Sequence, residues 1–140
     1  MRYVDTSVWV AAHTQETRTE DMQAWLGEQT PGTLTISDWV VTEFASALAM
    51  KLRMRLLEVH ARAEVLATFA QVKHASLELR VISRADFRLA EQFVHQHTTG
   101  LRASDALHLA VAANHGDRLY TLDKVLADAA TTLGVSARVL

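Results

Sequence analysis

Four acidic side chains could do chemistry together if the fold brings them to one place. They are Asp5, Glu43, Asp105 and Asp123. Carboxylates that crowd together repel one another, so a cation must lie among them or some must be protonated. Mg²⁺ or Mn²⁺ suits such oxygen donors better than Zn²⁺, because the chain has no cysteine and no well-placed histidine pair. These ions polarise phosphates and generate hydroxide from water, which is the chemistry of phosphodiester hydrolysis.

The elements expected around the acids are short strands that alternate with helices. The apolar runs predict strands at 3–4, 33–36, 79–82, 119–122 and 135–139. Helical patterns cover 6–13, 19–28, 38–53, 56–74, 83–97, 104–115 and 124–133. Strands separated by helices pair in parallel through right-handed crossovers. We therefore predict an α/β fold, a three-layer α/β/α sandwich with a five-stranded, mainly parallel sheet.

All four acids are expected at one rim of this sheet. Asp5 and Asp123 follow the first and the fourth predicted strands, Asp105 lies in the first turn of its helix, and Glu43 lies in the second turn of the helix after the second strand. The carboxyl ends of strands and the amino ends of such helices share a rim, and ligands bind there.

Three of the acids also have a purely structural interpretation. Asp123 could cap the helix that follows it, and Asp105 would favour the start of its own helix through the dipole. Glu43 could be an ordinary solvated helix residue. Asp5 is harder to explain in this way, because a carboxylate that ends a buried strand is costly unless it is paired or bound to a metal.

Composition and charge exclude several classes of protein. The chain has 140 residues, of which 49% are hydrophobic and 21% charged, as expected of one globular domain over residues 1–140. Without cysteine, disulfide frameworks and thiolate metal sites are excluded. The net charge of −2 argues against a basic protein that coats nucleic acid, but not against an enzyme with a local basic rim. No apolar run approaches the ~20 residues of a membrane span, and no signal peptide is recognisable, so we expect a cytoplasmic protein without membrane association.

Several other polar residues need an interpretation. Arg102 and Lys124 lie near the expected acid rim and are candidates for contacts with phosphate. The arginines at 80, 84 and 88 could form a basic strip. His108 follows Asp105 by three positions, and we expect it to make a structural hydrogen bond.

At these residues the chain resembles the PIN-domain ribonucleases. As a small single domain it most resembles the VapC toxins of prokaryotic toxin–antitoxin pairs. The resemblance covers almost the whole chain. Its segments are Asp5-Thr6-Ser7, Glu43 within 37–44, Asp105-Ala106-Leu107-His108-Leu109-Ala110 and Thr121-Leu122-Asp123. One departure is Leu126, where many members carry an aromatic residue. That departure leaves open whether Asp123 binds metal directly or through water.

The resemblance implies an endoribonuclease that depends on Mg²⁺, with Mn²⁺ as a substitute. Such a protein would be the toxin of a type II pair, and its substrate would be tRNA or another structured RNA. The resemblance assigns catalysis and metal binding to the four acids, with hydroxyl support from Thr6 and Thr121. It also implies a homodimer and a cognate antitoxin whose amphipathic segment lies in an apolar groove.

Two other function classes stay open at this point. One is a PIN-like module that binds protein without catalysis, although the presence of all four acids does not favour it. The other is phosphatase-like phosphoryl transfer through an aspartyl nucleophile. That chemistry usually needs a second acid two positions after the first, where this chain has Ser7.

Overall fold

The computed structural model describes all 140 residues and contains a single sheet of five strands. In chain order the strands are β1 (Arg2–Val4), β2 (Leu34–Ser37), β3 (Leu77–Arg80), β4 (Arg118–Thr121) and β5 (Ala137–Val139). Their spatial order is β3-β2-β1-β4-β5, and every neighbouring pair is parallel. The predicted α/β class and five-stranded sheet are confirmed, and the sheet is wholly parallel.

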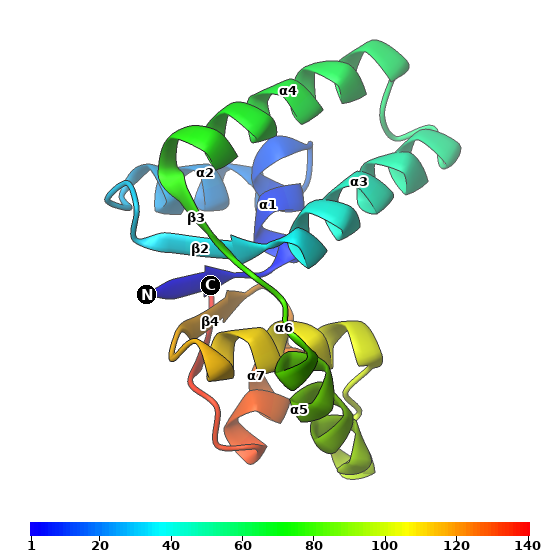
Figure 1. Cartoon of the computed structure of the whole chain (residues 1–140). Helices are drawn as coiled ribbons and strands as arrows, with labels where there is room; N and C mark the ends of the chain where they lie inside the picture. Colours follow the sequence, from blue (N-terminus) through cyan, green and yellow to red (C-terminus); the bar gives the residue numbers. More distant parts are fainter.

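Helices cover both faces of the sheet, as predicted for a three-layer sandwich. They are α1 (Thr6–His13), α2 (Thr19–Gly27), α3 (Asp38–Arg53), α4 (Val59–Ser76), α5 (Arg84–His95), α6 (Ala103–Asn114) and α7 (Lys124–Thr132), with a 3₁₀ turn, η1 (His97–Thr99). In Figure 1 the first four helices lie above the sheet, and α5, α6 and α7 lie below it. No helix combines the length and the apolar character that crossing a membrane requires.

Burial explains why these segments form a sheet with two covered faces. The central strands β1 and β4 are buried on both faces, with Tyr3, Val4 and Leu119 fully inaccessible to solvent. Helix α6 is buried continuously from Ala106 to Ala112, in agreement with its apolar sequence. These buried elements form a rigid frame beneath the carboxyl ends of the strands.

The third strand begins two positions earlier than the sequence pattern predicted. Helix α4 leads directly into β3, whose Leu77 pairs with Leu34 and whose Arg80 pairs with Ser37. Strand β2 becomes helix α3 at Asp38, so residues 81–82 have no neighbouring strand to pair with. The length of the partner strand, and not the apolar run, therefore sets the end of β3.

Candidate active site

Asp5 lies where β1 ends, and the adjacent strand fixes its backbone. Its amide donates to the carbonyl of Tyr120 (2.9 Å), which extends the β1–β4 pairing by one residue. Its side chain accepts two hydroxyl hydrogen bonds at Oδ2, from Ser7 (2.7 Å) and from Thr121 (2.8 Å). The other oxygen, Oδ1, lies 3.5 Å from Nε2 of His108. One oxygen of Asp5 is thus held by hydroxyl groups, and the other lies toward the histidine.

Glu43 lies one turn inside α3 and is held in a similar way. Its Oε2 accepts from the hydroxyl of Thr6 (2.7 Å) and lies 2.6 Å from Nε2 of His108. Burial by itself would raise the pKa of Glu43. The hydrogen bonds and charge of His108, together with the bond from Thr6, outweigh burial and hold this pKa below its usual value.

His108 connects the acids to the interior of the sheet. It is fully buried, and its Nδ1 lies 2.9 Å from the hydroxyl of Tyr3, which in turn lies 2.7 Å from Oγ of Ser37. The expected structural hydrogen bond of His108 is confirmed. Burial acts to lower the pKa of His108, but the adjacent Glu43 and Asp5 outweigh it and raise this pKa.

Asp105 has no hydrogen-bond or ion-pair partner in the protein, although it is only partly exposed in the first turn of α6. Burial is the largest cause of a raised pKa at Asp105, and the negative charges of Asp123 and Asp5 raise this pKa further. A carboxylate surrounded by like charges gains much from a nearby cation. A cation placed close to Asp105 would relieve this repulsion.

Asp123 has the capping role that the sequence offered as one of its two interpretations. Its Oδ1 accepts from the amides of Val125 (2.8 Å) and Leu126 (3.1 Å), so it caps helix α7. Its charge also contributes to the raised pKa of Asp105, so the same carboxylate lies close to the other acids. The cap fixes one oxygen and leaves the second one available.

The donor set fits a divalent cation of the Mg²⁺ or Mn²⁺ type. The carboxylate oxygens of Asp5 and Glu43 and the Nε2 of His108 lie within 4.8 Å of one another, and this Nε2 is engaged by the hydrogen bond to Glu43. Asp105 lies outside this group, but burial and the charges of Asp123, Asp5 and Glu43 raise its pKa. Carboxylate oxygens with at most one imidazole nitrogen suit these ions.

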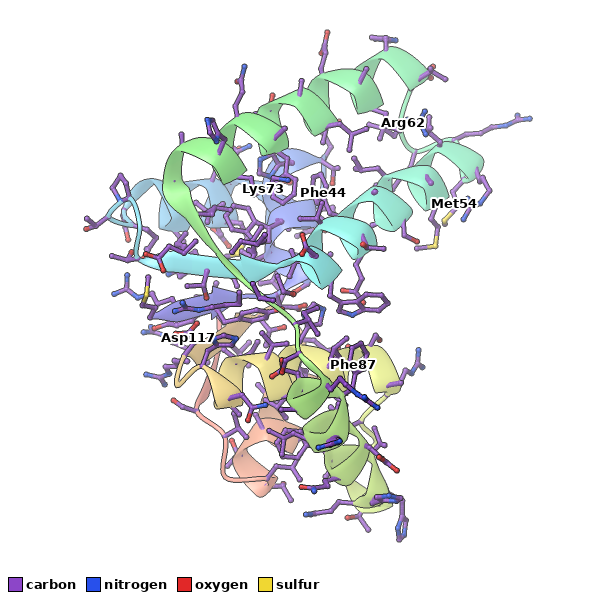
Figure 2. All side chains as sticks on the ribbon, viewed as in Figure 1. Phe44, Met54, Arg62, Lys73, Phe87 and Asp117 are labelled. Atoms are coloured by element: carbon purple, nitrogen blue, oxygen red, sulfur yellow. The ribbon has the colours of Figure 1, made fainter.

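The predicted basic residues have different surroundings. Arg102 is exposed at the N-cap of α6, and Lys124 is exposed with its Nζ 3.3 Å from Asp128. The prediction of a basic strip formed by the arginines at 80, 84 and 88 is wrong at Arg80. The guanidinium of Arg80 donates two hydrogen bonds to the carboxylate of buried Asp117 (2.8 and 3.0 Å). Figure 2 shows Asp117 at the edge of the sheet near the chain termini of Figure 1.

The resemblance assigned hydroxyl support to Thr6 and Thr121, whose hydroxyl groups donate to Glu43 and Asp5, but sequence reasoning missed the hydroxyl groups of Ser7, Tyr3 and Ser37. Ser7 binds Asp5 and also accepts from the amide of Leu122 (3.1 Å). Tyr3 and Ser37 extend the network from His108 into the sheet. The Asp-Thr-Ser triplet was a signal for Ser7, whereas nothing local marks Tyr3 or Ser37, because their contact depends on how β1, β2 and α6 pack.

Comparisons with known proteins find a matching family model and several structures of similar fold. The family model of the PIN domain matches residues 2–131. A search of curated protein sequences finds no match. The FitAcB structure from Neisseria gonorrhoeae is similar with a TM-score of 0.73 and 18% identity, covering 98% of this chain and 96% of that one.

Two Mycobacterium tuberculosis structures are also similar. VapC20, described as a sarcin–ricin loop cleaving toxin, has a TM-score of 0.72 and 18% identity over 92% of this chain and 95% of its own. VapBC-5, a member of the VapBC family of toxin–antitoxin systems, has a TM-score of 0.59 and 20% identity, covering 99% of this chain and 95% of that one. At these identities the similarity establishes a shared fold.

Proposed function

The chain belongs to the PIN domain family, and from this membership we propose that it is a metal-dependent endoribonuclease, the toxin of a type II toxin–antitoxin pair. The observation that carries the proposal is the unpaired carboxylate of Asp105, surrounded by the charges of Asp5, Glu43 and Asp123. Such an arrangement is costly in a protein that has no cation to place there.

In this proposal the four acids hold Mg²⁺, or Mn²⁺ in its place. Asp5, Glu43 and Asp105 bind directly, and Asp123 binds directly or through water. Bound there, the ion would polarise the phosphodiester and lower the pKa of the attacking water. Ser7 and Thr121 orient Asp5, and Thr6 orients Glu43, through the hydrogen bonds described above.

The proposed substrate is tRNA or another structured RNA. Arg102 stands exposed three positions before Asp105, and Lys124 follows Asp123 directly. Both can contact phosphates beside the scissile bond. The similar VapC20 toxin is described as cleaving the sarcin–ricin loop, which supports a structured RNA as the substrate class.

The proposed antitoxin binds in the groove between α4 and the α1–α2 pair. This groove has a volume of about 380 Å³ and is lined by Trp9, Leu26, Val72 and Leu77, with polar edges at Gln23 and Gln29. An amphipathic segment of a partner fits such a mixed surface.

We also propose a homodimer through helix α5. An apolar hollow of about 420 Å³ lies between α5, α6 and the start of α3, and it includes Trp39, Phe87 and Leu107. Phe87 is 59% exposed, and exposed Arg88 and Glu91 flank it along the helix. Two antiparallel α5 helices related by a two-fold axis would place Arg88 of one copy near Glu91 of the other.

Cleavage of total RNA by the purified chain tests the enzymatic part of the proposal. Wild-type protein should give discrete products with Mn²⁺ or Mg²⁺ and none with EDTA, and Asp5→Asn should give none. The matched control is Asp21→Asn, an exposed carboxylate paired with Arg18, which should cleave like wild type. Products that persist in EDTA or in Asp5→Asn would contradict the proposal, and metal binding without cleavage of any RNA would favour a non-catalytic binding module.

A further inference from the structure

We propose that His108 is a positioning residue that holds Glu43 in the geometry required for metal binding, with Tyr3 fixing the histidine ring. The inference rests on the proposed function and adds a role that the four acids do not cover. It concerns how strongly the site binds its cation.

The contacts form one continuous chain of polar side chains, in which only Glu43 is partly exposed. In the sheet, the hydroxyl of Tyr3 lies 2.7 Å from Oγ of Ser37 and 2.9 Å from Nδ1 of His108. On the other side of the histidine ring, Nε2 lies 2.6 Å from Oε2 of Glu43. The same oxygen of Glu43 accepts a hydrogen bond from the hydroxyl of Thr6 (2.7 Å). These residues belong to five elements, β2, β1, α6, α3 and α1. Ser37, Tyr3 and His108 are almost completely inaccessible to solvent. The chain therefore links the packing of the sheet directly to one carboxylate of the site.

The chemistry of the groups fixes the direction of the central hydrogen bond. An ionised carboxylate can only accept, so Nε2 of His108 carries a hydrogen and donates it to Glu43. The opposite ring nitrogen meets the hydroxyl of Tyr3, which can either accept or donate. Because both ring nitrogens have a partner, the imidazole cannot rotate without losing two buried hydrogen bonds.

Glu43 needs this support more than Asp5 does. Its side chain is longer and is 26% exposed, whereas the side chain of Asp5 is 9% exposed and has two hydroxyl donors. Without His108, Oε2 of Glu43 would keep only the bond from Thr6. Partners that orient a metal-binding side chain typically change metal affinity about 10- to 100-fold when they are removed.

Two substitutions at position 108 separate positioning from other roles. In His108→Gln the side-chain amide can donate near the former Nε2, so the bond to Glu43 is kept. In His108→Asn the shorter amide reaches only the region of the former Nδ1, so the bond to Tyr3 is kept and the bond to Glu43 is lost. Tyr3→Phe retains the volume of the aromatic ring and removes only the hydroxyl group that fixes His108.

The measurement is the dissociation constant of Mn²⁺ by titration calorimetry, on the full chain without RNA. We expect His108→Asn to weaken Mn²⁺ binding about 10- to 100-fold, Tyr3→Phe to weaken it less, and His108→Gln to restore most of the affinity. In cleavage assays the Mn²⁺ concentration for half-maximal activity should rise in His108→Asn, while kcat at saturating Mn²⁺ stays close to that of wild type.

Two results would overturn the inference while leaving the proposed function intact. One is unchanged Mn²⁺ affinity in both His108→Asn and Tyr3→Phe. The other is an equal loss in His108→Gln and His108→Asn, which would make the histidine a direct ligand. If His108→Asn has no cooperative melting transition, Tyr3→Phe decides the matter. Wild-type protein that binds no Mn²⁺ would contradict the proposed metal site itself.

Discussion

The hydroxyl of Thr121 donates to Oδ2 of Asp5 at 2.8 Å, although 116 positions separate the two residues in the chain. Thr121 is the last residue of β4, and Asp5 directly follows β1. The pairing of these two central strands therefore sets the orientation of the carboxylate. A change that disturbs the end of either strand should affect the site as well as the fold.

Thr121→Val tests this relationship, because valine has the shape of threonine without its hydroxyl group. The variant leaves the buried carboxylate of Asp5 with one donor fewer, and the amide of Asp123 loses the hydroxyl oxygen to which it donates at 2.9 Å. We expect it to lose about 1–3 kcal/mol of unfolding free energy in urea titrations and to need more Mn²⁺ for cleavage. Thr42→Val, which removes an exposed bond within α3, is the control. An equal loss of unfolding free energy in both variants would mean that the buried bond to Asp5 stabilises the fold no more than an exposed bond does.

Asp105→Asn should stabilise the metal-free protein. The pKa of Asp105 is raised by burial and by neighbouring acids, so its ionisation opposes folding as the pH rises above about 4. At neutral pH the variant should therefore melt at a higher temperature than wild type, and the difference should shrink in acid. Mn²⁺ should raise the melting temperature of wild type only. A metal-free variant that melts below wild type would contradict the repulsion inferred at this position.

Asp117→Asn should have the opposite effect on stability. Burial acts against the ionisation of Asp117, but bonds from Arg80 and Thr35 outweigh it and hold its pKa below the usual value. Its ionised form thus contributes stability above about pH 4 that is lost in acid. At pH 7 we expect the variant to lose about 3 kcal/mol, with a smaller loss at pH 3. Chemical denaturation at both pH values measures this, and a constant loss would contradict it.

Phe87→Glu tests the proposed α5 interface. Phe87 borders the apolar hollow and is visible beside α6 in Figure 2. A charge placed there on both copies would be buried and unpaired in a dimer. Sedimentation velocity should show a dimer for wild type and a monomer with an unchanged melting temperature for the variant. A variant that stays dimeric would mean that the interface lies elsewhere. The control is Val125→Glu, which places the same charge at an exposed position on α7 and should leave the dimer intact.

Arg102→Ala tests the proposed contact with RNA phosphate. Its exposed guanidinium makes no ion pair in the protein, whereas Lys124 already lies near Asp128. The variant should bind RNA more weakly, and the salt dependence of binding should fall by about one phosphate contact. Filter binding in the absence of divalent ions, at several salt concentrations, gives this slope. If Arg102→Ala and the partly exposed control Arg62→Ala, on helix α4, have equal slopes, Arg102 does not contact phosphate.

Much of the fold could be predicted because it depends on local patterns. The bounds of α1 (Thr6–His13) and α3 (Asp38–Arg53) agree with the predicted ones, and the apolar segment around Ala106–Ala112 forms a buried helix. The end of β3 could not be predicted from its own apolar residues, because its partner β2 determines where pairing stops. The single domain over residues 1–140 and the cytoplasmic location stay predictions.

The sequence by itself determined which elements form and that acids follow the strands or begin the helices at one rim. Apolar periodicity and parallel topology are sufficient for that conclusion, because every element needs only its own residues and its neighbours in the chain. Only the tertiary structure decided which oxygen each hydroxyl group holds, that His108 contacts both Tyr3 and Glu43, and that Arg80 pairs with Asp117. These partners are 37 to 105 positions apart. Strand register and helix packing bring them within hydrogen-bond distance, and no local pattern in the sequence records either.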